Sequence, residues 1–151
     1  MTFTYNDGGR AAAGYKGKAS DCVARSLAIV TGRPYSEIYE RLAAGNAAQR
    51  QTRGMKASRR GVHTASHGIN TKRKWFSAYA LELGLTWTPT MGIGTGCTVH
   101  ARRDELPSGR LILRLSRHCV AMIDGVIHDT YDPTRGGTRC VYGYWQQEAR
   151  S

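Results

Sequence analysis

A hairpin signal in the C-terminal part of the chain constrains the fold more than any other feature of the sequence. Two apolar, β-prone runs, 118–123 and 126–130, are separated only by Asp124 and Gly125. Asp-Gly between such runs is typical of a two-residue hairpin loop, because both residues tolerate the positive φ angles that the turn requires. The sequence therefore predicts two adjacent antiparallel strands in this region.

Helices are expected before this hairpin, and further strands around it. Apolar residues at helical spacing predict helices over 22–32, from residue 36 onward and over 74–83. Short strands are predicted over 86–88, 110–115 and 139–145, whereas the first 21 residues have an irregular pattern. This order predicts an α+β fold in a single domain over 1–151, with N-terminal helices packed against a small antiparallel sheet.

Capping residues indicate where the first two helices begin and end. Ser20 or Asp21 can cap the first helix, and Gly32 can end it in a left-handed conformation. Ser36 can cap the second helix in the same way as Ser20 or Asp21 can cap the first helix.

The net charge of +11 arises in one segment. Between Glu40 and Glu82 there are nine basic residues and no acidic one, and the rest of the chain is almost neutral. The middle of this segment, about 49–70, has no helical or strand period and predicts a long basic loop. Such a loop is a candidate arm for nucleic acid or an acidic protein, and the alternative is a solvated loop without a partner. The candidate partner-binding residues are Arg50, Arg53, Lys56, Arg59, Arg60, Lys72 and Arg73.

Composition narrows the class of protein. With 40% hydrophobic residues the chain has enough apolar material for a core, and its apolar runs are far shorter than the roughly 20 residues of a membrane span. The N-terminal residues lack the pattern of a signal peptide, so we expect a cytoplasmic protein whose four cysteines are free thiols. Metal-ligand spacings and nucleotide-binding glycine motifs are missing from the sequence, so neither a metal nor a cofactor is predicted.

Asp21 and Cys22 form the sharpest candidate site, because Cys22 lies in the first turn of a predicted buried helix. The N–H groups of that turn carry partial positive charge, which stabilises a thiolate and lowers the thiol pKa. A thiol nucleophile also needs a general base, and His118 at the start of the hairpin is the candidate.

An acidic residue is expected to orient that base. With a two-residue loop, Val120 lies opposite Asp129, so Asp129 is diagonal to His118 on the same face. Asp132 points to the other face unless a bulge shifts the register, which makes it the reserve candidate. The sequence thus predicts a catalytic triad of Cys22, His118 and Asp129.

These residues, together with segments 32–35 and 116–129, resemble a papain-like cysteine peptidase. The distant similarity is to the double-glycine leader peptidases, which also have an Asp-Cys pair opening a helix and a His-led strand that turns back to an Asp. The resemblance implies a papain-like fold and cleavage of a peptide or isopeptide bond by the triad. The whole chain, including segments 5–10, 88–91 and 138–145, is also similar to a group of small uncharacterised phage and prophage proteins, which implies the cytoplasm of an infected bacterium as its setting.

The chain departs from the leader-peptidase pattern beside the nucleophile. That family has a Gln a few residues earlier, whose amide helps to form the oxyanion hole, and here Lys16 and Lys18 occupy this neighbourhood. Asn6 is a further candidate donor. Val23 also stands where the family has Gly. These departures leave an alternative, which is a non-catalytic basic binding protein on an inactive papain-like fold.

Overall fold

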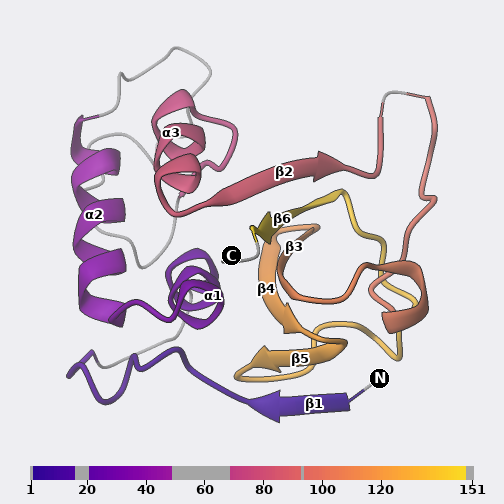
Figure 1. The fold of residues 1–151 in the computed structure, drawn as a ribbon, viewed down its shortest axis with the longest axis horizontal. Coiled ribbons are helices and arrows are strands. Elements are labelled where there is room, and N and C mark those ends of the chain that lie inside the picture. The colour runs from indigo at the N-terminus through magenta and orange to yellow at the C-terminus, as the bar shows by residue number, and fades with distance from the viewer. Residues whose placement is uncertain (1, 16–20, 49–68, 93, 149–151) are drawn as a thin grey trace.

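The computed structural model describes residues 2–15, 21–48, 69–92 and 94–148. Within these residues, three helices lie on one face of a six-stranded sheet (Figure 1). The helices are α1 (Cys22–Thr31), α2 (Tyr35–Ala48) and α3 (Lys74–Glu82), with a short 3-10 helix, η2, at Arg103–Glu105. The strands are β1 (Thr2–Tyr5), β2 (Leu85–Pro89), β3 (Arg110–Leu115), β4 (His118–Ile123), β5 (Val126–Asp129) and β6 (Gly143–Gln147). The predicted α+β class is confirmed.

The sheet is mixed, not antiparallel as predicted. Its strand order is β1-β5-β4-β3-β6-β2, and β1 is parallel to β5 while the other neighbours are antiparallel. The prediction that the first 21 residues are irregular is therefore wrong for Thr2–Tyr5. A four-residue strand has almost no periodic signal of its own, and β1 is stabilised by backbone hydrogen bonds to a strand far along the chain.

The predicted hairpin is confirmed in position and register. Ile123 pairs with Val126, and the pairing continues outward from the turn. Asp124 and Gly125 have φ angles of 48° and 81°, as a two-residue loop of this kind requires. The open end of the hairpin therefore brings the first residue of β4 close to the last residue of β5.

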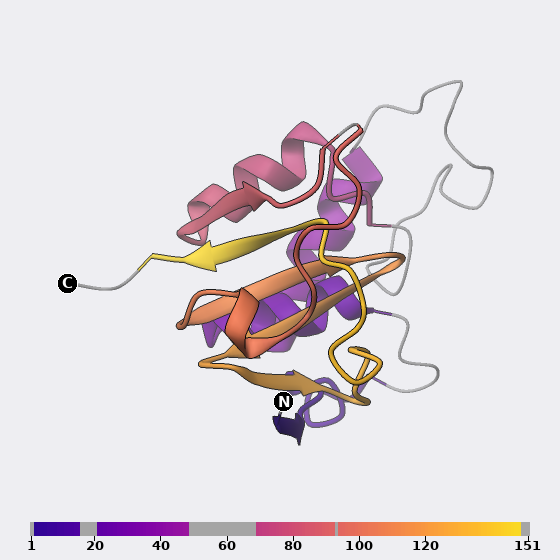
Figure 2. The same ribbon diagram turned by 90° about the vertical axis from the view of Figure 1, so that its right-hand side faces the viewer.

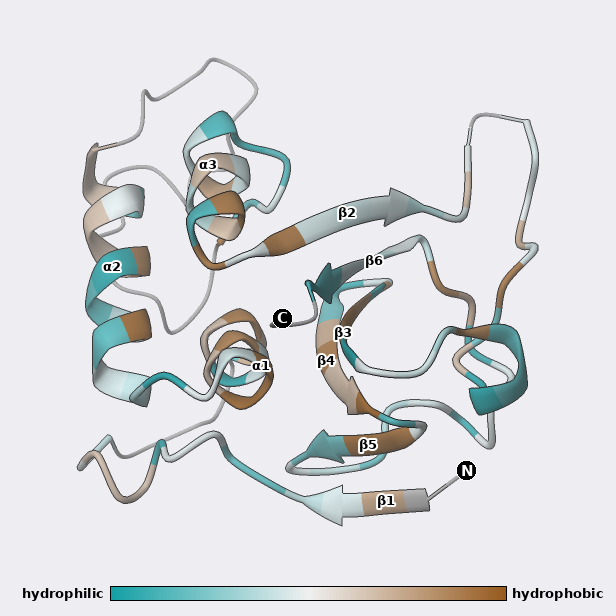
Figure 3. Cartoon of the chain, viewed as in Figure 1, coloured by the Kyte–Doolittle hydropathy of each residue, from teal (hydrophilic) through white to brown (hydrophobic). Residues whose placement is uncertain are grey.

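Helix α1 is the centre of the core. All its residues from 23 to 30 are buried, and it packs against β4 and α2. Figure 3 shows α1 as apolar on almost every side, whereas α2 has a hydrophilic outer face. Gly32 ends α1 with a φ of 72° and donates its N–H to Ala28, as predicted. The Arg110 guanidinium also donates to two carbonyl groups of the last turn, those of Ile29 and Val30.

The opposite face of the sheet carries a second apolar cluster, covered by loop segments and the short helix η2 instead of α-helices (Figure 2). One disulfide, Cys97–Cys140, joins two of these loops, so the prediction of four free thiols is wrong for this pair. The sequence separation of 43 residues left no local signal. Backbone hydrogen bonds from Ala101 to Arg139 and from Val141 to Val99 bring the two segments together.

Two smaller expectations also differ from the structure. Helix α2 begins at Tyr35, so Ser36 lies inside the helix and does not cap it. Strand β6 begins at Gly143 and not at Arg139, because residues 139–141 pair with the loop around 99–101. Among the described residues, no helix has the length and apolar character to cross a membrane.

Candidate active site

The candidate nucleophile lies where a buried helix reaches the surface. Helix α1 starts at Cys22, directly after Asp21, and the Cys22 side chain is partly exposed. The N–H groups of the first helical turn lie at the positive end of the helix dipole. This position favours a thiolate and leaves it open to a reactant.

His118 and Asp129 meet at the open end of the hairpin. His118 is the first residue of β4 and Asp129 is the last of β5, and both are buried. His118 Nε2 lies 2.7 Å from Asp129 Oδ2. Asp132, the reserve candidate, instead accepts hydrogen bonds from the backbone N–H and the hydroxyl of Thr134. Asp129 is therefore the carboxylate behind the imidazole.

The structure also brings Cys22 to His118, so that each of the two side chains shifts the pKa of the other. A hydrogen bond from Cys119 and the contact with His118 lower the pKa of Cys22 to about 4, although burial opposes this shift. Burial lowers the pKa of His118, but the hydrogen bonds to Asp129 and Cys22 raise it to about 9. Between these two values the pair is a thiolate beside an imidazolium. Because Nε2 contacts Asp129, Nδ1 is the ring nitrogen left for Cys22.

A second thiol supports the first. The interaction with Cys22, together with burial, raises the pKa of Cys119 well above that of an ordinary thiol. Cys119 therefore stays protonated beside the Cys22 thiolate. Sequence reasoning gave Cys119 no role. The available signal was strand alternation, which places Cys119 on the face of β4 that packs against α1.

A buried arginine ties the nucleophile helix to the acidic residue of the site. Arg25 Nη1 donates to Asp129 Oδ1 at 2.7 Å, and Arg25 Nε donates to Asp21 Oδ1 at 3.1 Å. Asp21 also accepts hydrogen bonds from Arg10 Nε and from the Tyr35 hydroxyl. Both carboxylate oxygens of Asp21 are thus occupied, which explains why its side chain makes no hydrogen bond to the helix that it precedes.

Sequence reasoning missed Arg25, although a signal was present. It is the single charged residue in the apolar run 22–31. A charged residue on a fully buried helix is expected to be paired, since an unpaired buried charge is strongly unfavourable. The pairing partner in this fold is the carboxylate that also contacts the candidate base.

Tyr131 covers one side of the candidate base. Its ring centroid lies 5.4 Å from that of His118, at an interplanar angle of 42°. Tyr131 is 51% exposed, so it lies at the surface beside the imidazole and is not part of the core.

Of the three predicted oxyanion donors, the structure describes Asn6 alone. The Asn6 amide group lies 3.3 Å from His128 Nδ1, and its carbonyl oxygen accepts the Gly8 N–H, so this side chain has local partners. Lys16 and Lys18 lie outside the described residues. The backbone N–H of Cys22, on the first turn of α1, belongs to the nucleophile itself and is a further candidate donor.

The basic arm is mostly outside the part of the chain that the structure describes. This applies to Arg50, Arg53, Lys56, Arg59 and Arg60. Lys72 and Arg73 are described and lie just before α3, with Lys72 exposed. Among the described residues, no cluster of His, Cys, Asp and Glu has an arrangement that could hold a metal ion.

Comparisons of this chain with known protein families, with curated proteins and with solved structures found no match. The arrangement of Cys22, His118 and Asp129 is therefore interpreted from its own geometry.

Proposed function

We propose that this protein is a papain-like cysteine hydrolase that cleaves a peptide or isopeptide bond. One observation carries the proposal: Cys22, at the N-terminus of a helix, lies near enough to His118 for each to shift the pKa of the other, and His118 Nε2 contacts Asp129. A nucleophile, a base and a residue that orients the base are the parts that thiol catalysis requires. The chain order Cys, His, Asp and the packing of a helix against a sheet support the papain-like assignment.

In this mechanism the Cys22 thiolate attacks the carbonyl carbon of the scissile bond, and the backbone N–H of Cys22 stabilises the oxyanion. The His118 imidazolium then donates its proton to the leaving amine, and a thioester remains on Cys22. Water attacks the thioester while His118 accepts its proton. The acid is released and the thiolate and imidazolium are restored. Asp129 keeps the imidazole oriented throughout and stabilises its charged form.

Alkylation by iodoacetamide tests the activated thiol. Because the pKa of Cys22 lies near 4 and that of His118 near 9, the labelling rate at Cys22 is expected to be high at pH 6 and almost constant up to pH 8. The rate for glutathione, a free thiol, rises steeply over the same range. In a His118→Ala variant the pKa of Cys22 rises, so its rate should also climb with pH. Mass spectrometry of the labelled peptide locates the reacting residue.

Cys119→Ser is the matched control for this experiment, because Cys119 is buried and protonated while Cys22 is partly exposed. Labelling should persist in Cys119→Ser and disappear in Cys22→Ser. A wild-type protein that labels at Cys22 with the pH dependence of glutathione contradicts the proposal and favours the non-catalytic binding protein.

A further inference from the structure

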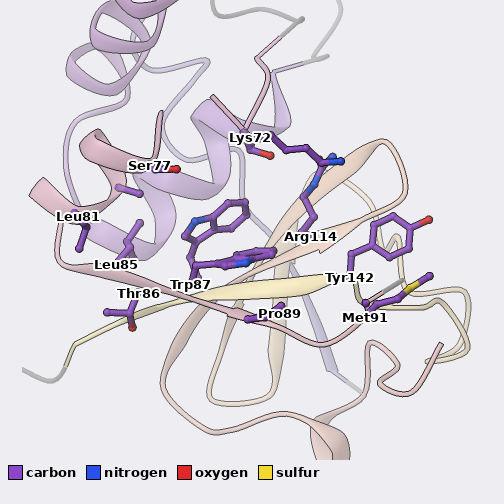
Figure 4. Close-up of a pocket in the computed structure, with 14 residues that line it drawn as sticks. Lys72, Ser77, Leu81, Leu85, Thr86, Trp87, Pro89, Met91, Arg114 and Tyr142 are labelled. Carbon is purple, nitrogen blue, oxygen red and sulfur yellow. The ribbon is translucent and has the colours of Figure 1, made fainter. Parts of the chain in front are cut away.

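A cavity of about 990 Å³ lies between α3, β2 and the end of β3 (Figure 4). Its apolar lining includes Leu81, Leu85, Trp87, Met91 and Trp145. Trp87 is 44% exposed although it is one of the largest apolar side chains in the protein. Exposed aromatic side chains that line a concave surface are typical of ligand sites.

A glycine opposite β2 makes room for this aromatic lining. A Cβ atom on Gly143 would collide with the Trp87 ring, so the missing side chain lets the indole lie directly against β6. There the Trp87 ring contacts the Trp145 ring, with centroids 4.5 Å apart. The two indoles form a continuous apolar surface inside the cavity.

The described residues that line the same cavity include two cations, Lys72 and Arg114, and no Asp or Glu. Figure 4 shows Arg114 and Tyr142 at the end of the cavity away from Leu81, with the Lys72 side chain directed toward Arg114. Within the described residues, neither Lys72 nor Arg114 forms an ion pair with a carboxylate. An arginine in such a position is suited to a carboxylate, which it can bind through two parallel hydrogen bonds.

The cationic end of the cavity adjoins the thiol site. Arg114 pairs with Cys119 on one side and with Gly143 on the other, so it lies one strand away from the hairpin. Cys119, the residue opposite Arg114, is in turn near enough to Cys22 for the two thiols to shift each other's pKa. A group held by Arg114 is therefore close to a group attacked by Cys22.

We propose that this cavity is the substrate site of the Cys22 hydrolase, and that the substrate is a peptide with a carboxylate next to the scissile bond. Arg114 and Lys72 bind the carboxylate, and a large apolar side chain nearby in the peptide lies against Trp87 and Trp145. The inference rests on the proposed function and adds a substrate class to it. The carboxylate belongs either to an acidic side chain or to the C-terminus of the peptide.

Binding to Cys22→Ala protein tests the carboxylate site without requiring catalysis. The probes are pentapeptides with an acetylated N-terminus and an amidated C-terminus. Each contains a Phe and a Glu two positions apart, with either residue first, and each has a counterpart in which Gln replaces Glu. We expect at least one Glu peptide to bind tenfold or more tightly than its Gln counterpart, measured by tryptophan fluorescence. Gln peptides with a free C-terminal acid form a further arm, and tight binding there identifies a terminal carboxylate as the recognised group.

Variants of the two cations assign the preference to the cavity. Lys72→Ala and Arg114→Leu should each bring the ratio of the affinities for the Glu and Gln peptides closer to one. Arg114→Lys should retain part of the preference for the Glu peptide. Lys74→Ala is the matched control, since this exposed lysine is close in sequence but does not line the cavity. Its ratio should equal that of the parent protein.

Hydrolysis of the same peptides by wild-type protein separates the two proposals. Cleavage that depends on Cys22 but does not distinguish Glu, Gln or a free C-terminal acid overturns the substrate assignment. Selective binding of a carboxylate peptide without any cleavage that depends on Cys22 overturns the proposed function. Equal binding of all probes to Cys22→Ala protein also overturns the substrate assignment.

Discussion

Arg25 is the residue that links the two halves of the site. Its guanidinium contacts Asp129 from β5 and Asp21 from the start of α1, and all three side chains are buried. The position of Asp129 behind His118 therefore depends on a residue that would touch no substrate. Arg25 is a positioning residue in this sense, not a catalytic one.

Replacing Arg25 with Leu should destabilise the protein by about 3–5 kcal/mol, because two buried carboxylates would lose a shared cation. Urea denaturation measures the change in the free energy of unfolding. Arg33→Leu is the control, since its i,i+4 ion pair with Glu37 is exposed and should contribute no more than about 1 kcal/mol. Equal effects of the two substitutions would contradict the role of Arg25.

At the residue scale, the sequence predicted the members of the site that follow from local patterns. Cys22 follows from the start of a helix, and Asp129 follows from His118 through the register of a two-residue hairpin loop. Arg25 and Cys119 were missed because their roles depend on contacts between elements. The pairing of Cys22 with His118 itself could only be proposed, since no local pattern reports a long-range contact.

At the scale of elements, the N-terminal segment shows why the sheet was only partly predictable. Helix α1, the hairpin and β3 carry strong periodic signals and were predicted with good boundaries. Strand β1 is short and its partner β5 is distant in sequence, so its pairing is set by the tertiary fold. The backbone N–H of Asn6, just after β1, donates to the carbonyl of Asp129, which ties this segment to the site.

Gly8 lies in the N-terminal segment that follows β1, and a substitution there tests how closely this segment packs against α1. A Cβ atom there would lie 2.9 Å from the Arg25 carbonyl oxygen, and the residue has a φ of 70°. Gly8→Ala should therefore cost more than the roughly 1–2 kcal/mol expected from positive φ alone. Gly14→Ala is the matched control, with a φ of 90° and no atom within 4 Å of the added group. The prediction fails if both variants lose the same free energy of unfolding.

At the scale of the whole molecule, the Cys97–Cys140 disulfide fastens the loops that cover the face of the sheet opposite the helices. It closes a loop across a sequence separation of 43 residues, for which chain entropy gives a stabilisation of about 4 kcal/mol. The sequence argued against it, because the expected cytoplasmic setting disfavours disulfides.

A reducing agent should therefore lower the free energy of unfolding of the wild-type protein by about this amount. Urea denaturation with and without a phosphine reductant measures the difference. A Cys97→Ser, Cys140→Ser double variant should match the reduced wild-type protein and respond no further to the reductant. An unchanged wild-type stability under reduction would show that the bridge contributes nothing.

The topology of the site also determines when it can work. Arg25 and Asp129 are separated by 104 residues, and β5 lies between β1 and β4 in the finished sheet. On a ribosome, the thiol would emerge long before the histidine and the carboxylate that activate it. Domains generally fold as units during synthesis, so the nascent chain carries an unactivated cysteine until β4 and β5 are made. The proposed hydrolase would thus be unable to cleave its own unfinished chain or the ribosomal proteins around it.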